Sequence, residues 1–469
     1  MKYSDNQREV FVDKNIAVLG IGVEGLSSAK FLKQFTSKIT FFDQKERSDL
    51  DGNTLLEAEE TGKVILGKDS FTDFSGFDFI FRSPGVKMDE ESLIHAKEKG
   101  ARITSQTKLF FDLCPSVIIG VTGTKGKGTT STLIYEILKK SGRKTFLGGN
   151  IGTPPLDFLH ELDEQSIVVL ELSSFQLQDL EKSPHIAVML MVVPEHLDYH
   201  KDVAEYIDAK RNILRFQSKD DFVIINRDYL ASNESDLYTD AQVFWVSRER
   251  TTTEQGCFVR DNALWMRMRG SEWKIIDGDK IALLGRHNLE NASAASVAAM
   301  LAGAAKSDIV DVLSSFTGLP HRLEFVREVN GVKYYDDSFS TTPETAIAAI
   351  ESFKKPMVLI LGGSSKHSDF TELGKVIASS EYITTIIGIG DEWPTIKEAI
   401  DNAVSKDNES KKKAIYLEGA KDMRTIVQAV SKVAVEGDVV LLSPACASFG
   451  IFRNYKDRGN QFKKEVQAL

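Results

Sequence analysis

The stretch from Val117 to Lys140 constrains the fold most, because it joins an apolar run, a glycine-rich turn and an amphipathic segment. Val117 to Ile119 suits a buried parallel strand, and Leu133 and Ile137 lie on one face of the helix that should follow. The glycines between them let backbone N–H groups turn inward, and the helix N-terminus adds partial positive charge. The stretch therefore predicts a phosphate-binding strand–loop–helix in an α/β fold.

The same turn carries side chains suited to a nucleotide and a metal ion. Lys127 supplies a full charge for β- and γ-phosphates, and Thr129 or Thr130 supplies a hydroxyl for Mg²⁺. Gly128 stands where the P-loop pattern usually has Ser or Thr, so Thr129 is the favoured metal ligand. A glycine-rich turn without a nucleotide is the alternative, and the flanking strand and helix argue against it. The residues expected to contact ATP here are Gly123, Thr124, Lys125, Gly126, Lys127, Gly128, Thr129 and Thr130.

Length and composition exclude several classes of protein. A chain of 469 residues needs more than one domain, and 42% hydrophobic with 27% charged residues is typical of soluble globular proteins. The net charge of −10 argues against non-specific nucleic-acid binding. Three widely spaced cysteines argue against a disulfide framework or a zinc–thiolate site. The N-terminus lacks the apolar core of a signal peptide, and no apolar run is long enough for a membrane span, so we expect a cytoplasmic protein without membrane insertion.

A second phosphate-binding pattern lies nearer the N-terminus. The apolar run Ile16 to Leu19 leads into the G-x-G-x-x-G turn Gly20 to Gly25, and a second run, Ile39 to Phe42, ends at Asp43. A helix N-terminus can hold a phosphate, and a carboxylate can accept a hydrogen bond from a ribose hydroxyl, so NAD and a UDP-sugar both fit. Ser83 begins a Ser-Pro-Gly turn after a further strand, at the edge where ligands of open α/β sheets bind.

Alternating strand and helix patterns predict three α/β domains, covering residues 1–112, 113–318 and 319–469. In the middle domain, apolar strands each end in polar residues, which is typical of an open, mostly parallel sheet with its site along one edge. Short alternating runs between Ala241 and Leu284 predict a small antiparallel sheet attached to that domain.

Taken in order, nine motifs of the chain resemble those of the Mur ligases, ATP-dependent amide-forming enzymes of peptidoglycan precursor synthesis. They are G-V-T-G-T-K-G-K-G-T-T (Gly120 to Thr130), G-G-N-I-G (Gly148 to Gly152), E-L-S-S-F-Q-L (Glu171 to Leu177), E-H-L-D (Glu195 to Asp198), H-N-L-E-N (His287 to Asn291), G-L-P-H-R (Gly318 to Arg322), D-D-S (Asp336 to Ser338), L-G-G-x-x-K (Leu361 to Lys366) and S-P-A-C-A-S (Ser443 to Ser448). The third and last motifs indicate the member that adds D-glutamate to UDP-N-acetylmuramoyl-L-alanine. The resemblance implies a Rossmann-like UDP-binding domain, a P-loop ATP-binding domain and a mobile, Rossmann-like domain for the amino acid.

The resemblance also implies two Mg²⁺ ions beside the phosphates, with Thr129, Glu171, His196 and Lys210 as ligands. His196 is assigned from the E-H-L-D motif, although the residues just before it differ slightly from the family's usual sequence. Lys210 is expected to be carbamylated by CO₂, which needs the neutral amine and turns a cation into an anion. Without the resemblance, a lone histidine or a helical lysine would be interpreted as structural or solvated. The implied catalytic residues are Lys127, His196, Lys210 and Arg322.

Three ligand sites follow from the resemblance. The adenine and ribose side of ATP is assigned to Asn288, Asn291, Arg322 and Asp337, with Arg322 reaching the γ-phosphate when the third domain closes. The residues assigned to the UDP substrate are Gly22, Val23, Glu24, Asp43, Ser83 and Asn150. The residues assigned to the amino acid are Thr341, Lys366, Ser448, Phe449 and Tyr455, with Lys366 pairing with a glutamate carboxylate.

The segment after Ser338 departs from the D-glutamate ligases, which usually read Lys-Ala-Thr-Asn there. This chain reads Phe339-Ser340-Thr341-Thr342, so Phe339 replaces a lysine expected near the phosphates and the glutamate site. Lys125 is a candidate for the missing positive charge. L-glutamate, or another acidic residue, therefore stays an alternative to D-glutamate.

Three other functions remain as alternatives. A nucleotide-dependent oxidoreductase would use the G-x-G-x-x-G turn and Asp43 but would leave the P-loop unexplained. A non-catalytic ATP-binding protein on a ligase scaffold draws only on the altered segment after Ser338. A folate- or cyanophycin-type ligase shares the G-K-G-T wording, but the Glu171 to Leu177 and Ser443 to Ser448 motifs argue against it. We expect a monomer that binds small-molecule substrates and no nucleic acid.

Overall fold

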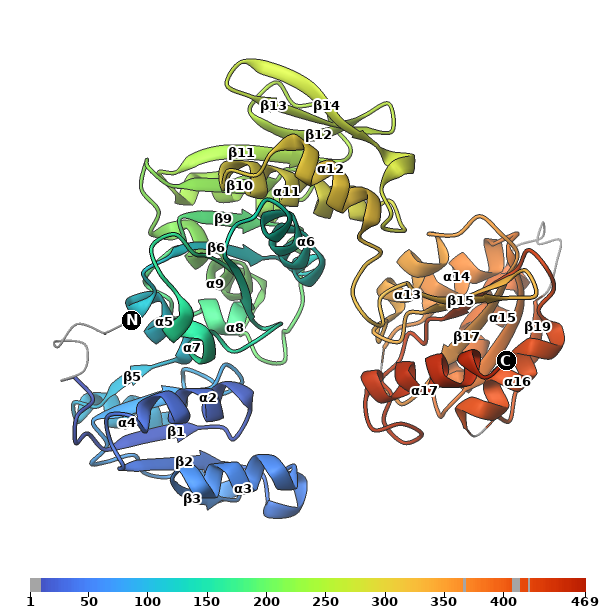
Figure 1. The fold of residues 1–469 in the computed structure, drawn as a ribbon. Helices are drawn as coiled ribbons and strands as arrows, with labels where there is room; N and C mark the ends of the chain where they lie inside the picture. Colours follow the sequence, from blue (N-terminus) through green and yellow to red (C-terminus); the bar gives the residue numbers. More distant parts are fainter. Residues whose placement is uncertain (1–9, 366–367, 407–413, 421) are drawn as a thin grey trace. The chain divides into compact units, whose positions relative to one another are not determined.

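The computed structural model describes residues 10–365, 368–406, 414–420 and 422–469. It divides into two compact units: Met1–Lys280 with Glu290–Leu313, and Ile281–Leu289 with Ser314–Leu469. Each unit is described by itself. Figure 1 shows the helices and strands with the labels used below.

A five-stranded parallel sheet, in the order β3-β2-β1-β4-β5, opens the first unit. Every residue of β1 and β4 is buried, as the apolar runs predict for central parallel strands. The strands are β1 (Ile16–Leu19), β2 (Ile39–Asp43), β3 (Lys63–Leu66), β4 (Phe79–Arg82) and β5 (Arg102–Thr104). The helices are α2 (Val23–Leu32), η1 (Arg47–Asp49), α3 (Gly52–Thr61), η2 (Lys68–Phe71), α4 (Glu91–Glu98) and α5 (Gln106–Leu113).

A nine-stranded sheet, in the order β14-β13-β12-β11-β10-β9-β6-β8-β7, completes the first unit. Its strands are β6 (Val117–Thr122), β7 (Thr145–Gly149), β8 (Ile167–Glu171), β9 (Ile186–Met189), β10 (Phe222–Asn226), β11 (Gln242–Ser247), β12 (Gly256–Arg260), β13 (Ala263–Met268) and β14 (Ser271–Asp277). The three alternating runs predicted as a small antiparallel sheet form β11, β13 and β14; β13 and β14 pair antiparallel, and β12, which was not predicted, pairs antiparallel with β13. Strand β11 instead pairs in parallel with β10 and β12, so these strands extend the main sheet.

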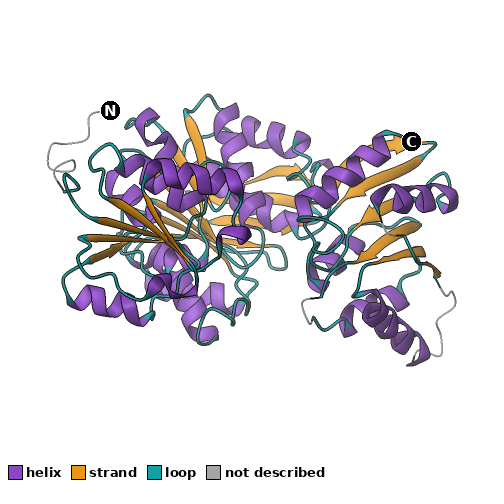
Figure 2. Ribbon diagram, turned by 90° about the horizontal axis from the view of Figure 1, so that it is seen from below, coloured by secondary structure: helices purple, strands orange, loops and turns teal. Residues whose placement is uncertain are grey.

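Helices pack on both faces of these sheets (Figure 2). Those that follow β6 are α6 (Lys127–Lys140), α7 (Pro155–Phe158), η3 (Leu159–Glu161), α8 (Ser174–Leu177), α9 (Val203–Arg215), α10 (Leu230–Asn233), η4 (Glu234–Tyr238), η5 (Gly278–Lys280), α11 (Asn288–Leu301) and α12 (Lys306–Ser315). Strand β6 lies between β8 and β9, with Val121 opposite Glu171 and Thr122 opposite Met189. The loops that leave these three strands therefore meet at one edge of the sheet.

The second unit holds a six-stranded sheet in the order β15-β16-β20-β17-β18-β19. Its strands are β15 (Glu324–Val329), β16 (Val332–Asp336), β17 (Met357–Gly362), β18 (Ile383–Ile389), β19 (Ile415–Leu417) and β20 (Val439–Leu442). Only β15, which the sequence did not predict, pairs antiparallel among these strands. The helices are α13 (Pro343–Ile350), α14 (Thr371–Ser379), α15 (Trp393–Lys406), α16 (Met423–Val433) and α17 (Tyr455–Gln467).

The three sheets, with helices between their strands, confirm the predicted α/β fold class. The predicted limits at residues 112 and 318 stay predictions. Among the helices that the structure describes, none is long and apolar enough to cross a membrane.

Candidate active site

The turn between β6 and α6 forms a cradle that only glycine can shape at two positions. Gly123 and Gly126 have φ of +151° and +87°, in the region that other residues rarely adopt. A Cβ on Gly126 would lie 2.3 Å from Oδ1 of Asn291, and a Cβ on Gly123 would lie 2.8 Å from Cβ of Leu190. The turn and the start of α6 therefore have the form of a phosphate-binding loop, in which backbone N–H groups can face an anion.

Hydrogen bonds fix the rest of this turn. The Thr124 N–H donates to Met191 O at 2.6 Å, and its Oγ1 donates to Val193 O at 2.9 Å. Lys127 Nζ donates to the carbonyls of Gly123 and Thr124, both at 3.1 Å. The lysine charge thus lies over the turn, in reach of an anion held there.

Helix α11 brings one predicted ATP residue to the cradle. Thr130, which is fully buried, donates from Oγ1 to Oδ1 of Asn291 at 3.3 Å. Asn288, on the first turn of α11, donates from Nδ2 to Leu284 O at 2.6 Å. The division between the two compact units falls between these two asparagines.

Glu171 ends β8 beside the cradle. Its side chain is 4% exposed, and Nδ2 of Asn150 donates to its Oε1 at 3.2 Å. The Asn150 N–H also donates to Glu171 O at 2.9 Å, so two predicted residues are tied together. Thr129 is also buried, and its hydroxyl and the Glu171 carboxylate are the kind of hard oxygen donors that Mg²⁺ prefers.

Lys210 is a buried lysine of the first unit. It lies on α9, is 2% exposed, and its Nζ donates to Gly123 O at 2.8 Å. Burial and then the nearby charge of Lys127 hold the pKa of Lys210 well below its usual range. A buried amine that is readily neutral has the form needed to react with CO₂, and the resulting carbamate would suit a divalent cation.

His196 lies in the loop after β9 with a left-handed backbone, at φ of +57°. Its ring centroid lies 5.0 Å from that of Phe175, and partial burial lowers the pKa of its imidazole. A neutral imidazole is the metal-binding form. The preceding Glu195 pairs with Lys125 at 2.5 Å, so the lysine suggested as a substitute charge already has an acidic partner.

The predicted UDP residues gather around the G-x-G turn of the first sheet. Asp43 Oδ2 accepts from the Ile21 N–H at 2.8 Å, and the Ser83 N–H donates to Leu19 O at 3.0 Å. A Cβ on Gly20 would lie 2.8 Å from the Ser83 hydroxyl. Gly22 caps α2, and Val23 and Glu24 form its first turn, with the Val23 side chain exposed.

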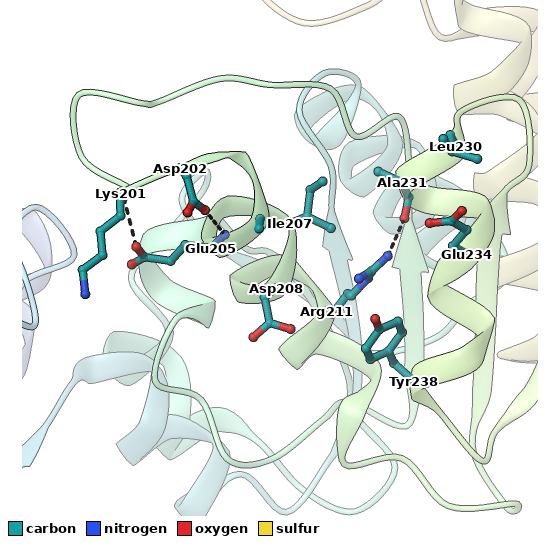
Figure 3. Close-up of a pocket in the computed structure, with 11 residues that line it drawn as sticks. Lys201, Asp202, Glu205, Ile207, Asp208, Arg211, Leu230, Ala231, Glu234 and Tyr238 are labelled. Atoms are coloured by element: carbon teal, nitrogen blue, oxygen red, sulfur yellow. Dashed lines mark hydrogen bonds between the residues drawn. The ribbon is translucent and has the colours of Figure 1, made fainter.

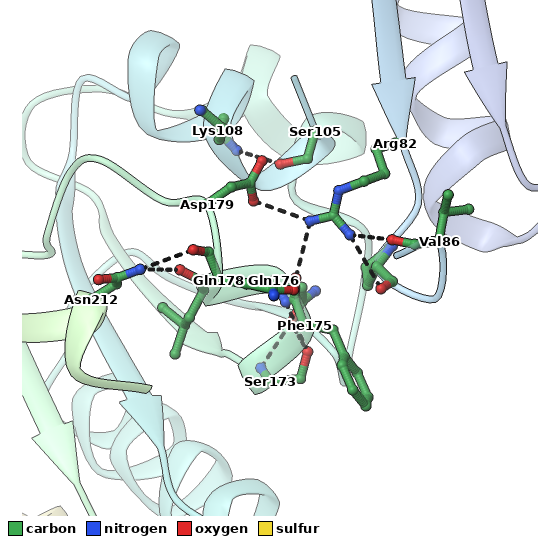
Figure 4. Close-up of polar contacts among 12 residues, drawn as sticks. Arg82, Val86, Ser105, Lys108, Ser173, Phe175, Gln176, Gln178, Asp179 and Asn212 are labelled. Atoms are coloured by element: carbon green, nitrogen blue, oxygen red, sulfur yellow. Dashed lines mark hydrogen bonds and ion pairs between the residues drawn. The ribbon is translucent and has the colours of Figure 1, made fainter. Parts of the chain in front are cut away.

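Sequence reasoning missed Arg82, which links the first sheet to the loops beside Glu171 (Figure 4). Arg82 is 2% exposed and pairs with Asp179 at 3.1 Å. It also donates to Phe175 O at 3.3 Å and to Val86 O at 2.7 Å. Its only signal in the sequence is a cation at the end of an apolar strand, before a Ser-Pro-Gly turn.

A second link joins the start of α2 to the E-L-S-S-F-Q-L motif. Gln176 Nε2 donates to Glu24 Oε1 at 2.6 Å, and the same glutamine completes the capping box with Ser173. Burial raises the pKa of Glu24 to about 7, against the opposing effects of Gln176 and Arg82. The UDP-binding turn and the strand end that carries Glu171 therefore belong to one hydrogen-bonded structure.

The second unit brings together several residues predicted for ATP and the amino acid. Asp337 is buried and accepts from the hydroxyls of Ser340 and Ser443, and burial raises its pKa to about 7. The Ser338 hydroxyl donates to Tyr455 O at 2.8 Å. Ser448 is buried and Phe449 is exposed, while Thr341 is intermediate. Lys366 lies outside the described residues.

A hollow of about 710 Å³ lies on another side of α9, between that helix and α10 with η4 (Figure 3). It is lined by Lys201, Asp202, Ala204, Glu205, Ile207, Asp208, Arg211, Leu230, Ala231, Glu234 and Tyr238. Arg211 stacks over the Tyr238 ring at 4.1 Å and donates to Ala231 O at 3.4 Å. None of the predicted site residues lines it.

Three family models match the chain in order. They are described as the N-terminal domain of MurD-like Mur ligases (residues 14–105), the Mur ligase middle domain (residues 121–299) and the Mur ligase glutamate ligase domain (residues 321–446). The matches cover each of the three sheets described above.

Curated relatives match over the whole chain. A protein of Acetivibrio thermocellus named UDP-N-acetylmuramoylalanine--D-glutamate ligase is 38% identical over 468 residues, which is 100% of this chain and 99% of the relative. A protein of the same name from Clostridium botulinum (strain 657) is 39% identical over 460 residues, 97% of each chain. A crystal structure of MurF from Acinetobacter baumannii is similar with a TM-score of 0.62 and 15% identity, covering 99% of both chains, which supports the fold alone.

Proposed function

The chain belongs to the Mur ligase family, and on that premise we propose that it adds D-glutamate to UDP-N-acetylmuramoyl-L-alanine with ATP, in peptidoglycan precursor synthesis. The observation that carries the proposal is full-length similarity to relatives named as D-glutamate ligases. The phosphate cradle at the end of β6 supports it, because amide formation in water requires an activated carboxylate.

The chemistry has two steps. The substrate carboxylate attacks the γ-phosphorus of ATP, ADP leaves, and an acyl phosphate forms; the glutamate amine then attacks the acyl carbon, and phosphate leaves as the amide forms and a proton is released. Lys127 and the N–H groups of the cradle hold the β- and γ-phosphates in line and offset their charge. Asn288, Asn291 and Asp337 bind the adenine and ribose side of ATP, and Arg322 binds its γ-phosphate.

The metal ligands that we propose are Thr129, Glu171, His196 and a carbamylated Lys210, for two Mg²⁺ ions. Bound divalent cations neutralise charge on the transferring phosphoryl group and the attacking carboxylate. The burial of Glu171 and Lys210 next to the cradle supports this assignment. In the carbamylation, the neutral Lys210 nitrogen bonds to the carbon of CO₂ and releases one proton.

Carbamylation is tested on active enzyme with metal bound. We expect electron density, or an intact mass measured under native conditions, to show one added CO₂ on Lys210. Free lysine at this position in active, metal-bound enzyme would contradict the assignment. Lys201, on the exposed loop before α9, is the matched internal control and should stay unmodified.

The UDP substrate is assigned to the G-x-G turn. We propose that Gly22, Val23 and Glu24 contact its phosphates, while Asp43 binds the uridine. Ser83 and Asn150 line the path to the reacting carboxylate. The hydrogen bond from Gln176 to Glu24 and the pairing of Arg82 with Asp179 support a fixed path between the two sheets. The domain limits that we propose remain 1–112, 113–318 and 319–469.

Thr341, Lys366, Ser448, Phe449 and Tyr455 are proposed to bind the amino acid. Phe339 replaces the lysine that is usual after Asp-Ser in D-glutamate ligases, so the same ligation with L-glutamate is the second candidate. We propose that the protein acts as a cytoplasmic monomer, which light scattering coupled to gel filtration tests directly.

Phosphate release tests the function. The protein, ATP, Mg²⁺ and UDP-N-acetylmuramoyl-L-alanine are incubated with D-glutamate, L-glutamate or D-aspartate, with a control that lacks the UDP substrate. We expect turnover with D-glutamate alone. Turnover with L-glutamate instead would favour the second candidate, and no turnover with any of the three would overturn the proposal.

A further inference from the structure

Arg322 lies between two residues with left-handed backbones. The φ angles of His321 and Leu323 are +64° and +46°, and neither is glycine. Such a conformation is strained for L-residues and persists only where the surroundings hold it. We call residues 320–323 the arginine loop.

Carboxylates of the same unit hold the arginine loop. The His321 N–H donates to Glu324 Oε2 at 2.8 Å, and its Nδ1 lies 2.7 Å from Asp336 Oδ2. The Leu323 N–H donates to Asp337 Oδ1 at 3.1 Å. Because His321 and Asp336 are both buried, these bonds fix the direction in which Arg322 leaves the backbone.

Phe339 fixes the far end of the Arg322 side chain. The guanidinium carbon lies 3.8 Å from the centroid of the Phe339 ring, the distance of a stacked cation–π pair. The ring is itself held, because the Phe339 N–H donates to His321 O at 3.0 Å. The ring also makes an edge-to-face pair with Tyr455, with centroids 4.9 Å apart and an 84° angle between the rings.

Stacking uses the face of a guanidinium and leaves its N–H donors in the plane, which is the geometry that binds phosphate or carboxylate oxygens in pairs. A long arginine side chain held in this way also loses less rotamer freedom when an anion binds. Both effects favour anion binding by Arg322 without Phe339 touching the anion.

We propose that Phe339 is a positioning residue of the ligation reaction, whose ring holds the Arg322 guanidinium in the orientation that binds the phosphates of ATP. The proposal rests on the proposed function for the identity of the anion. It assigns a role to Phe339, the residue at which the sequence departs from the expected Asp-Ser-Lys motif.

A double-mutant cycle on the full chain tests this role. Phe339→Leu should lower kcat/KM for ATP by about 2- to 30-fold, the range of a cation–π contact, with KM for the UDP substrate unchanged. Phe339→Tyr keeps a ring and should restore most of the activity. In the Arg322→Met background, Phe339→Leu should have no further effect, since the guanidinium that it positions is gone.

Phe325→Leu is the matched control, because Phe325 is an exposed phenylalanine of the same unit, and its ring packs at a tilt against Tyr335 with centroids 5.4 Å apart. It should leave kcat/KM for ATP unchanged. The proposal is overturned if Phe339→Leu matches the wild type, if Phe339→Tyr is as impaired as Phe339→Leu, or if Phe339→Leu loses as much in the Arg322→Met background as alone.

The wild type, Phe339→Leu, Phe339→Tyr, Arg322→Met and the double variant are also compared by thermal unfolding with ATP and Mg²⁺ and no other substrate. We expect ATP to raise the Tm of the wild type and Phe339→Tyr more than that of Phe339→Leu, and equally little in both Arg322→Met proteins. A wild type that is stabilised by ATP but forms no amide would overturn the proposed function. The shifts in Tm would then decide the role of Phe339. Equal stabilisation of the wild type and Phe339→Leu would overturn that role.

Discussion

The phosphate cradle of the first unit and the arginine loop of the second both present a cation, but they shape the backbone in opposite ways. In the cradle, Gly123 and Gly126 adopt positive φ because they lack a Cβ that would meet Leu190 or Asn291. In the arginine loop, ordinary residues adopt positive φ because the carboxylates of Glu324, Asp336 and Asp337 hold them there.

The backbone of the cradle depends on glycine for its conformation, whereas that of the arginine loop depends on hydrogen bonds to side chains. A cradle made of glycine and backbone keeps its form when a side chain is removed, so its variants should lose activity and keep stability. In a loop held by side-chain hydrogen bonds, removing a side chain should lower both activity and stability. The variants below are chosen to break or sharpen this contrast, beginning with the largest expected effect.

Arg458 should show the largest effect, in the second unit. It is fully buried and donates five hydrogen bonds, to Ser338 Oγ and O, to Cys446 O twice and to Ala447 O. Arg458→Met should lower the free energy of unfolding by about 3–5 kcal/mol, because polar groups that are buried around the guanidinium lose a charged donor. Chemical denaturation measures the loss.

Arg458→Lys should restore only part of that stability, because an ammonium lacks the planar set of donors. Exposed Arg453 is the matched control, and Arg453→Met should change the free energy of unfolding by no more than about 0.5 kcal/mol. A fully stable Arg458→Met would mean that side chains do not hold this region, and the contrast between the two units would fail.

Lys127→Met tests the opposite expectation in the first unit. Removing the charge over the cradle should lower kcat by about 10²- to 10³-fold, the usual cost of losing one charge-stabilising donor. Stability should change by no more than about 1 kcal/mol, because the hydrogen bonds from Lys127 to the carbonyls of Gly123 and Thr124 are only partly buried.

Lys139→Met, on the exposed last turn of the same helix, should match the wild type in both measurements. Loss of stability in Lys127→Met comparable to that of Arg458→Met would show that the cradle also depends on a side chain for its shape.

Asp337 gives the smallest effect, and it depends on pH. Burial raises its pKa in the folded state to about 7, above the ordinary value for an unfolded chain, so the folded state binds the proton more tightly. Stability from this group is therefore present at low pH and is lost as the pH rises through 7. Between pH 6 and 8 the wild type should lose about 1 kcal/mol relative to Asp337→Asn.

Thermal unfolding at pH 6, 7 and 8 measures this difference, with exposed Asp391→Asn as the control for the general effect of pH. A constant gap between the wild type and Asp337→Asn across this range would mean that the carboxyl group does not titrate there, which would contradict a pKa of about 7.

The sequence predicted the sheets well, because their central strands are unbroken apolar runs and glycine-rich turns follow them. The sequence did not predict the outer strands of two of these sheets correctly. β15 was not predicted, since the burial of its residues does not alternate clearly between core and solvent. The run that forms β11 was predicted to belong to the small antiparallel sheet but pairs in parallel with β10 and β12, because a sequence pattern does not show which strands pair.

The sequence also placed the cradle, where one turn holds Gly123, Gly126 and Lys127 together. It did not reveal the contacts between distant segments, such as the pairing of Arg82 with Asp179 or the stacking of Arg322 on Phe339. Those contacts depend on how loops from different strands meet at a sheet edge, and no local spacing encodes that.

The chirality of the product tests the central claim most directly. The protein is incubated with ATP, Mg²⁺, UDP-N-acetylmuramoyl-L-alanine and racemic glutamate, and the purified product is hydrolysed for chiral analysis of its glutamate. We predict one product with one added glutamate, all of it in the D form. L-glutamate in the product, or no glutamate-containing product from folded protein, would contradict the account.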